Sequence, residues 1–338
     1  MSEEKKTLSA FLRSVEDRIK KQTLPGVTSF RVKVTDRVIE LRFTAPGSAG
    51  TAARFMTGIV TDESDAAEPD AVFYYWCEDL SPYVPESGGG AGVWRMRDGT
   101  GFVRVTPNYS MIAADYASRT CFFCRQPSGA KEYMLYGHAM IVSFGIWAEL
   151  CGMLLLHSAC VGAGGRGVML SARGGGGKST LAVSCLLDGF DFVADDYILV
   201  NRTGELKAMP LYRTVGLNTD MADILKPPMP VVSTDPERNG KLLLDASAFG
   251  FSRELPVKAI IHPVVSATDS PQIRPASAGP VLAAIIESTA TQTGVFRDPG
   301  PYRRMAERLM GIPVYEILLS RDLDLNRKYL KNFIVREL

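Results

Sequence analysis

The chain has 338 residues, which is long enough for two domains with sizeable hydrophobic cores. Apolar residues make up 46% of it and charged residues 22%, as in ordinary soluble proteins, and the net charge of +1 implies no general attraction to nucleic acid or membranes. No apolar run reaches spanning length, and the charged N-terminus lacks a signal-peptide pattern. With six scattered cysteines, mostly in apolar runs, the sequence favours a cytoplasmic protein with no nucleic-acid or membrane partner.

Residues 1–130 are expected to form a β-rich domain. An amphipathic helix is predicted at Leu8–Lys21, and a hairpin follows from two alternating, β-branched runs at Val27–Val34 and Val38–Phe43. Further strands are predicted at Ala71–Cys77, Val93–Met96, Phe102–Val105, Tyr109–Tyr116 and Arg119–Phe123. The aromatic residues Tyr74, Tyr75, Trp76 and Trp94 either pack this sheet, which is the favoured interpretation, or form a binding surface.

Residues 131–338 mix helical and strand patterns, which predicts an α/β domain. A long, largely apolar helix is predicted at Glu132–Gly152, leading directly into the apolar run LLLHSACV that contains His157. By itself this histidine is better explained as a core residue than as a catalytic one.

A glycine loop follows the predicted strand Val168–Leu170 and precedes a predicted helix at Thr180–Leu187. The loop contains Gly174, Gly175, Gly176 and Gly177 and continues into Lys178, Ser179 and Thr180. Glycines without Cβ atoms let backbone N–H groups surround a phosphate, the lysine supplies a positive charge, and the serine hydroxyl suits Mg²⁺. Ala172 replaces the first glycine of the usual G-x-x-x-x-G-K-[ST] pattern. The loop predicts a nucleotide-phosphate site; the alternative is a flexible glycine linker.

Two adjacent carboxylates, Asp195 and Asp196, interrupt the apolar strand pattern FDFVADDYILV. Buried carboxylates cost several kcal/mol unless they meet a cation or a hydrogen-bond donor. A Mg²⁺–nucleotide beside Lys178 would supply both, although a solvated turn is the alternative.

The rest of the chain continues the mixed pattern. Strands are predicted at Leu206–Leu211, Lys241–Leu244, Val257–Val265 and Ile312–Leu319, and helices at Pro280–Thr289, Tyr302–Met310 and Asn326–Val335. Arg238 and Lys241 either reach the phosphates or substrate, or belong to a surface loop. His262 is expected to be structural, and Pro263 indicates that its strand lies at an edge or ends there.

His157-Ser-Ala, the glycine loop with Lys178-Ser179, and Val193-Ala-Asp195-Asp196 together resemble the catalytic domain of HPr kinase/phosphorylase and its kinase relatives. That family shares its core with phosphoenolpyruvate carboxykinase. The resemblance is close over about fifty residues and looser from about Ile141 to Leu319. It implies a P-loop α/β kinase core spanning 131–338, preceded by the β-rich domain.

The resemblance also implies roles. Asp196 would accept the proton of a substrate serine hydroxyl, Lys178 would hold the transferring phosphates, and His157 would lie at the active centre. The glycine loop, with Lys178, Ser179 and Thr180, would bind ATP, and Ser179 and Asp195 would hold Mg²⁺. The implied reaction is phosphoryl transfer to a serine of a peptide or small protein, in which the enzyme mainly positions the reactants and neutralises charge.

One departure narrows this expectation. Bacterial HPr kinases carry a metal-binding glutamate in an E-[IV]-R-G-x-G segment, whereas the corresponding region here reads LYRTVGLNTD. This favours the HPr kinase-related branch found beside peptide-modifying gene clusters, including lasso-peptide kinases. The alternatives are a small-molecule kinase of the same fold and a nucleotide-binding regulatory protein without turnover. A homo-oligomer also stays open.

Overall fold

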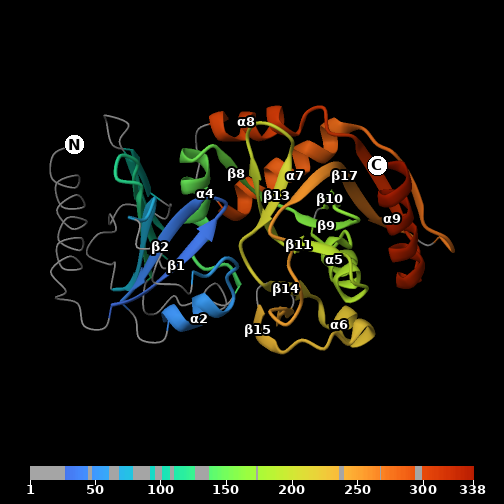
Figure 1. Ribbon diagram of the computed structural model, residues 1–338, viewed down its shortest axis with the longest axis horizontal. Helices are drawn as coiled ribbons and strands as arrows, with labels where there is room; N and C mark the ends of the chain where they lie inside the picture. Colours follow the sequence, from blue (N-terminus) through green and yellow to red (C-terminus); the bar gives the residue numbers. More distant parts are fainter. Residues whose placement is uncertain are drawn as a thin grey trace. The chain divides into compact units, whose positions relative to one another are not determined.

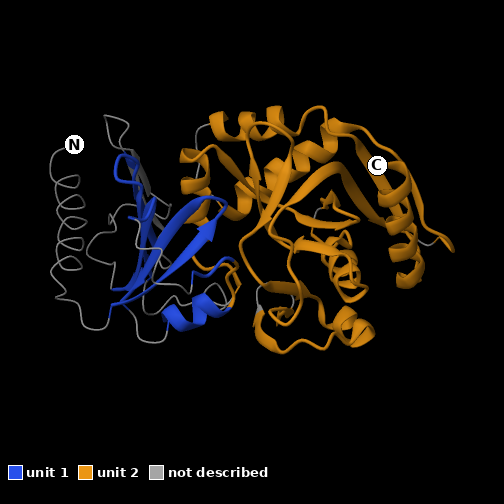
Figure 2. Cartoon of the chain, in the orientation of Figure 1, with its two compact units in different colours: residues 1–54, 58–135 blue, residues 55–57, 136–338 orange. Residues whose placement is uncertain are grey.

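The computed structural model describes residues 27–44, 48–60, 68–78, 92–95, 101–106, 110–125, 137–172, 174–235, 240–266, 268–293 and 299–338. The chain divides into two compact units, one of residues 1–54 and 58–135 and the other of residues 55–57 and 136–338 (Figure 2). The short segment 55–57 belongs to the second unit because it pairs with residues 211–213, through Arg213 N–H to Phe55 O and Thr57 N–H to Leu211 O. The helix predicted at Leu8–Lys21 lies outside the described residues.

The first unit is built on one seven-stranded sheet in the order β1-β2-β3-β7-β6-β5-β4. Its elements are β1 (Thr28–Val34), β2 (Arg37–Phe43), α2 (Ser48–Arg54), β3 (Ala71–Cys77), β4 (Gly92–Arg95), β5 (Gly101–Thr106), β6 (Ser110–Asp115) and β7 (Thr120–Arg125). The hairpin predicted from the first two β-branched runs is confirmed, since β1 and β2 pair antiparallel. The predicted strands of this half are likewise found within a few residues of their expected ends.

The aromatic residues of β3 pack the sheet. Tyr74, Tyr75 and Trp76 are all buried, and Tyr74 and Tyr75 stack on Phe122 and Phe123 of the neighbouring strand β7. Aromatic pairs in adjacent strands add packing energy to the area that they bury. This confirms packing over a binding surface for the three residues.

The second unit is a mixed α/β structure (Figure 1). Up to the Asp pair it contains α4 (Ile141–Leu150), β8 (Met153–His157), β9 (Ala159–Ala163), β10 (Arg166–Leu170), α5 (Lys178–Leu187) and β11 (Asp191–Ala194). It continues with β12 (Tyr197–Asn201), β13 (Lys207–Pro210), β14 (Thr214–Leu217), α6 (Thr219–Leu225), β15 (Val231–Asp235) and β16 (Lys241–Asp245). The last elements are β17 (Leu255–Val265), β18 (Gln272–Pro275), α7 (Ala278–Thr293), α8 (Pro299–Leu309), β19 (Val314–Leu319) and α9 (Leu323–Glu337).

The main sheet of this unit has two buried faces. Strands β10, β17 and β19 run parallel at its centre, and consecutive residues of β10 alternate between two hydrophobic cores. Val168 and Leu170 pack in the core that includes α5 and α9, whereas Met169 packs in the core that includes α7 and α8. Parallel strands covered by helices on both sides are expected to be apolar throughout, which explains the continuous apolar run. The glycine loop leaves this sheet at the carboxyl end of β10.

Three sequence expectations need correction. The single helix predicted at Glu132–Gly152 is interrupted at the left-handed Met140, and its described part after this break, α4, runs from Ile141 to Leu150; residues 132–136 lie outside the described residues. The single strand expected around the Asp pair is two strands, β11 and β12, which pair with different partners. Of the two expectations for Pro263, an edge strand is wrong, because β17 is central; the other fits, since Pro263 lies two residues from the end of β17 and beyond Ile261, where pairing with β10 stops, so the missing N–H costs no bond on that side.

Candidate active site

The candidate site lies where two neighbouring chain segments, 153–163 and 191–201, are each interrupted between two strands. Strand β8 pairs with β12 and strand β9 pairs with β11, so the break at Ser158 lies opposite the break at Asp195-Asp196. Neither aspartate belongs to a strand, and the Asp195 carbonyl accepts from a lysine side chain. Because strand pairing is interrupted in both segments at the same place, polar side chains can lie between the β8–β12 pair and the β9–β11 pair.

The glycine loop has the backbone conformation that a phosphate cradle needs. Gly175 and Gly177 adopt φ angles of 83° and 86°, which L-residues with a Cβ rarely adopt. A Cβ at Gly177 would also come within 3.0 Å of Leu319 Cδ1. Helix α5 begins immediately after this glycine, at Lys178. The loop thus leads directly into a helix N-terminus, whose free N–H groups and dipole favour an anion.

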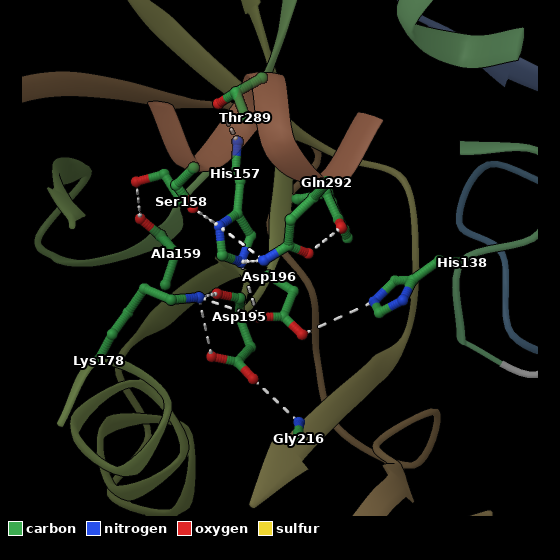
Figure 3. A network of polar contacts seen from close by, with 12 residues as sticks. His138, His157, Ser158, Ala159, Lys178, Asp195, Asp196, Gly216, Thr289 and Gln292 are labelled. Atoms are coloured by element: carbon green, nitrogen blue, oxygen red, sulfur yellow. Dashed lines mark hydrogen bonds and ion pairs between the residues drawn. The ribbon is translucent and has the colours of Figure 1, made fainter. Parts of the chain in front are cut away.

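Lys178 is directed from the start of α5 toward the Asp pair (Figure 3). Its Nζ donates to the Asp195 carbonyl at 2.6 Å and to Asp196 Oδ1 at 3.0 Å, and it lies 3.8 Å from Asp195 Oδ1. The lysine and both aspartates are buried. The structure therefore brings together the three charged residues that the sequence singled out from separate segments.

The Asp195 side chain is held by a backbone N–H of strand β14. It is 0% exposed, and Oδ2 accepts the Gly216 N–H at 2.9 Å. Among the described residues, its other oxygen, Oδ1, is buried without a hydrogen-bond partner, and the nearby Lys178 Nζ lies beyond hydrogen-bond distance at 3.8 Å. A buried carboxylate oxygen is costly without a donor or cation in direct contact, so Oδ1 fits a hard ion such as Mg²⁺.

Within the described ranges, no group of three or more His, Cys, Asp or Glu side chains is arranged to hold a metal ion by itself. Mg²⁺ is commonly held by one or two protein oxygens together with phosphate oxygens and water, and Asp195 Oδ1 with the Ser179 hydroxyl would match that pattern. Ser179 and Thr180 are half-buried in the first turn of α5. The side chains that contact Asp196 come from other described residues.

Asp196 is the centre of the network. Lys178 and His157 approach Oδ1 at 3.0 and 3.4 Å, whereas Lys241 and His138 approach Oδ2 at 3.5 and 3.7 Å. Burial alone would raise the pKa of Asp196, but Lys241, Lys178 and the hydrogen bond with His157 outweigh it and hold that pKa well below its usual range. The carboxylate is therefore ionised and shared by two cations.

His157 is oriented by helix α7. Its Nδ1 is hydrogen-bonded to the Ser288 hydroxyl, its backbone N–H donates to Thr289 Oγ1 at 3.0 Å, and the Gln292 amide nitrogen lies 3.3 Å from both ring nitrogens. Burial, followed by the nearby Lys178, lowers the pKa of His157 despite the adjacent Asp196. A neutral ring with Nε2–H directed to Asp196 and Nδ1 accepting from Ser288 satisfies the contacts with Asp196 and Ser288, and it leaves only Nδ1 able to accept from the Gln292 amide.

All three histidines of the chain lie near this region. His138 packs edge-on against Tyr197 and Tyr212, while the Nδ1 of His262 is 2.7 Å from the Ser171 carbonyl, at the start of the glycine loop. His262 thus contacts loop backbone, in line with the structural role predicted for it. Arg238 lies outside the described residues.

Sequence reasoning missed several contributors. The sequence pattern does not indicate His138, Gly216, Ser288 or Gln292 as site residues, and it leaves two alternatives open for Lys241, a site residue or a surface residue. One usable signal was the polar stripe on α7, because Ser288 and Gln292 are four residues apart and share a helix face.

No described helix is long and apolar enough to cross a membrane.

No family model matches the chain, and a search of curated proteins finds no match. Among solved structures, the chain is similar to the Hpr(Ser) kinase/phosphatase from Coxiella burnetii, with 15% identity over 54% of this chain and 94% of that chain, at a TM-score of 0.29. At that score the likeness carries no weight for fold or function.

Proposed function

We propose that the chain is an ATP-dependent kinase that transfers the γ-phosphate to a serine hydroxyl of a peptide or small protein, with peptide natural-product precursors as the first class to test. The observation that carries the proposal is the 3.0 Å contact between Lys178, at the N-terminus of a glycine-loop helix, and Asp196. A phosphate-binding cation and a carboxylate are thereby placed within one site.

The roles of the residues follow from their positions. The loop N–H groups and Lys178 bind the donor phosphates, and Lys178 exchanges its contact with Asp196 for contacts with phosphate oxygens. Asp195 Oδ1 and the Ser179 hydroxyl are the oxygen donors that would hold Mg²⁺, which would supply further charge neutralisation. Asp196 then accepts the proton of the acceptor hydroxyl. A weak base is adequate here because phosphoryl transfer depends chiefly on positioning and charge stabilisation.

His157 acts on Asp196 rather than on the phosphates. Its ring is held by Ser288 at Nδ1 and meets Asp196 Oδ1 on the other side, 3.4 Å from Nε2, while its backbone N–H is held by Thr289 Oγ1. This contact fixes the carboxylate orientation, while its second oxygen, Oδ2, faces Lys241 and His138. The resemblance of His157-Ser-Ala, the glycine loop and the Asp pair to HPr kinase relatives supports the same assignment.

The acceptor is either a peptide or a small molecule, and we propose a peptide. The β-rich first unit would contribute to peptide recognition, in keeping with a separate substrate-binding domain. A small-molecule kinase would use the same phosphate machinery, so the acceptor must be tested directly.

The test is transfer of label from γ-labelled ATP, with Mg²⁺, to peptides and small proteins encoded beside this gene. The matched variants are Asp196→Asn and Lys178→Ala. Label in a serine of one acceptor, lost in both variants, would establish the proposal. Label in a small molecule would replace the peptide by a metabolite. ATP binding without transfer to any acceptor would favour a regulatory nucleotide-binding protein.

A further inference from the structure

Lys241 reaches the site along a path that only glycine leaves open. It begins strand β16, whereas Gly216 lies on the paired strand β14. A Cβ at Gly216 would lie 2.3 Å from Lys241 Cε and 2.6 Å from its Nζ, distances that real Cβ contacts do not reach. The lysine side chain therefore lies directly over the Gly216 backbone, on its way to Asp196.

The two lysines divide the carboxylate between them. Lys178 Nζ contacts Asp196 Oδ1 at 3.0 Å and Lys241 Nζ contacts Oδ2 at 3.5 Å. The side chain of Lys241 is 18% exposed and that of Lys178 8% exposed. Lys241 thus makes the longer contact and is the more accessible cation. With two aspartates and two lysines, the charges of the site balance only while no phosphate is bound.

A polyphosphate donor changes that balance. The glycine loop and Lys178 account for one end of a bound phosphate chain, yet Asp195 and Asp196 lie beside it and would repel the added negative charge. A second ammonium group on a flexible stem, already close to Asp196, is suited to offset that repulsion as a mobile point charge.

We propose that Lys241 is a second donor-binding residue, which moves from Asp196 Oδ2 onto the phosphate oxygens of the nucleotide, and that Gly216 is required because it leaves this path open. The inference rests on the proposed function for the identity of the donor. It concerns binding, however, and can hold or fail independently of phosphoryl transfer.

The experiment is isothermal titration calorimetry with Mg²⁺–ATP and, separately, with inorganic pyrophosphate. Lys241→Gln removes the charge, while Gly216→Ala keeps the charge and displaces it, because the atoms that the new methyl meets are the far end of a flexible side chain. We expect both variants to bind roughly 10- to 100-fold more weakly, as for the loss of one charged hydrogen bond. Lys258→Gln, which removes a lysine paired with Glu205 on the surface, should bind like the wild type.

An indirect effect must be separated from a direct one. Without Lys241, Asp196 would hold Lys178 more firmly, and this alone would weaken phosphate binding. The comparison of Asp196→Asn with Asp196→Asn/Lys241→Gln removes that competition. A direct contact predicts that the double variant binds pyrophosphate more weakly than Asp196→Asn, whereas equal affinities would show that Lys241 is only a counter-ion and would overturn the inference.

Failure of the inference and failure of the proposed function give different results. Phosphate binding that depends on Lys241, in a protein that transfers phosphate to no acceptor, would leave the inference standing and remove the kinase. Phosphate transfer by the wild type, with normal ATP binding by the Lys241→Gln variant, would support the kinase and overturn the inference. If Gly216→Ala does not fold, the Lys241→Gln comparisons decide the matter.

Discussion

The replacement Asp196→Asn should destabilise the protein, although it removes a charge from a crowded acidic pair. Asp196 attracts Lys178 at 3.0 Å and Lys241 at 3.5 Å. At an effective dielectric constant of about 20, these attractions are about 5.5 and about 4.7 kcal/mol, before the cost of desolvating the charges is subtracted. Breaking a buried ion pair by removing one partner costs about 3–5 kcal/mol. Because the asparagine oxygen can still accept from Lys178, we expect a loss near the lower limit, about 3 kcal/mol.

The sign of this change is informative. If the lysines lay elsewhere in solution, Asp195 and Asp196 would repel each other, and the asparagine would relieve that repulsion and stabilise the protein. The assay is equilibrium urea unfolding at neutral pH, followed by both fluorescence and circular dichroism, whose transitions must coincide for a single free energy to be meaningful. Asp188→Asn is the control. The Asp188 side chain is 41% exposed and its contact with Arg327 is long, at 3.9 Å, so removing this charge should cost less than about 1 kcal/mol. An unchanged or raised midpoint for Asp196→Asn would refute the resting arrangement described above.

Two further predictions concern His157 and Gly177. Since the folded-state pKa of His157 is lowered from 6.5, the unfolded chain binds the proton more readily, so stability is greatest above pH 6.5 and falls as the pH drops toward the folded pKa. The loss from this group is at most about 1.4 kcal/mol per pH unit, and His157→Gln should reduce the difference in urea midpoint between about pH 7.5 and about pH 5.5; an equal difference would mean that the ring is not buried and neutral. Gly177→Ala should cost about 1–2 kcal/mol of stability and weaken pyrophosphate binding, because φ is 86° in the loop. Gly189→Ala, at φ 73° in open space, should show comparable strain with unchanged binding; normal binding in both would exclude the loop as a phosphate cradle.

Local chemistry made the glycine loop predictable. Its glycines, Lys178 and the flanking strand and helix are consecutive in sequence, and the left-handed φ angles of Gly175 and Gly177 require the residue type that the pattern contains. The β1–β2 hairpin was predictable for a similar reason, since two β-branched runs joined by a short turn pair with each other. In both cases the determining residues lie within about one element of each other.

The rest of the site depends on pairings between distant segments, which residue patterns do not encode. Lys241 approaches Asp196 only because β16 pairs with β14, and β14 places the Gly216 N–H on Asp195. The orientation of His157 likewise depends on α7, which lies 131 residues later at Ser288. The Asp pair looked like part of one strand because both flanking runs are apolar, yet each run pairs with a different partner.

The charge balance of the site explains why these distant contributions belong together. Two adjacent buried carboxylates, Asp195 and Asp196, are costly unless cations accompany them, and Lys178 alone supplies one. The second cation comes from β16, and the contact that it makes is the longer and the more exposed of the two. A site so arranged is neutral at rest, and its two ammonium groups become available to phosphate when both lysines leave Asp196. Phosphate binding and the release of Asp196 to accept a proton are then the same event, which links occupancy by the donor to activation of the base.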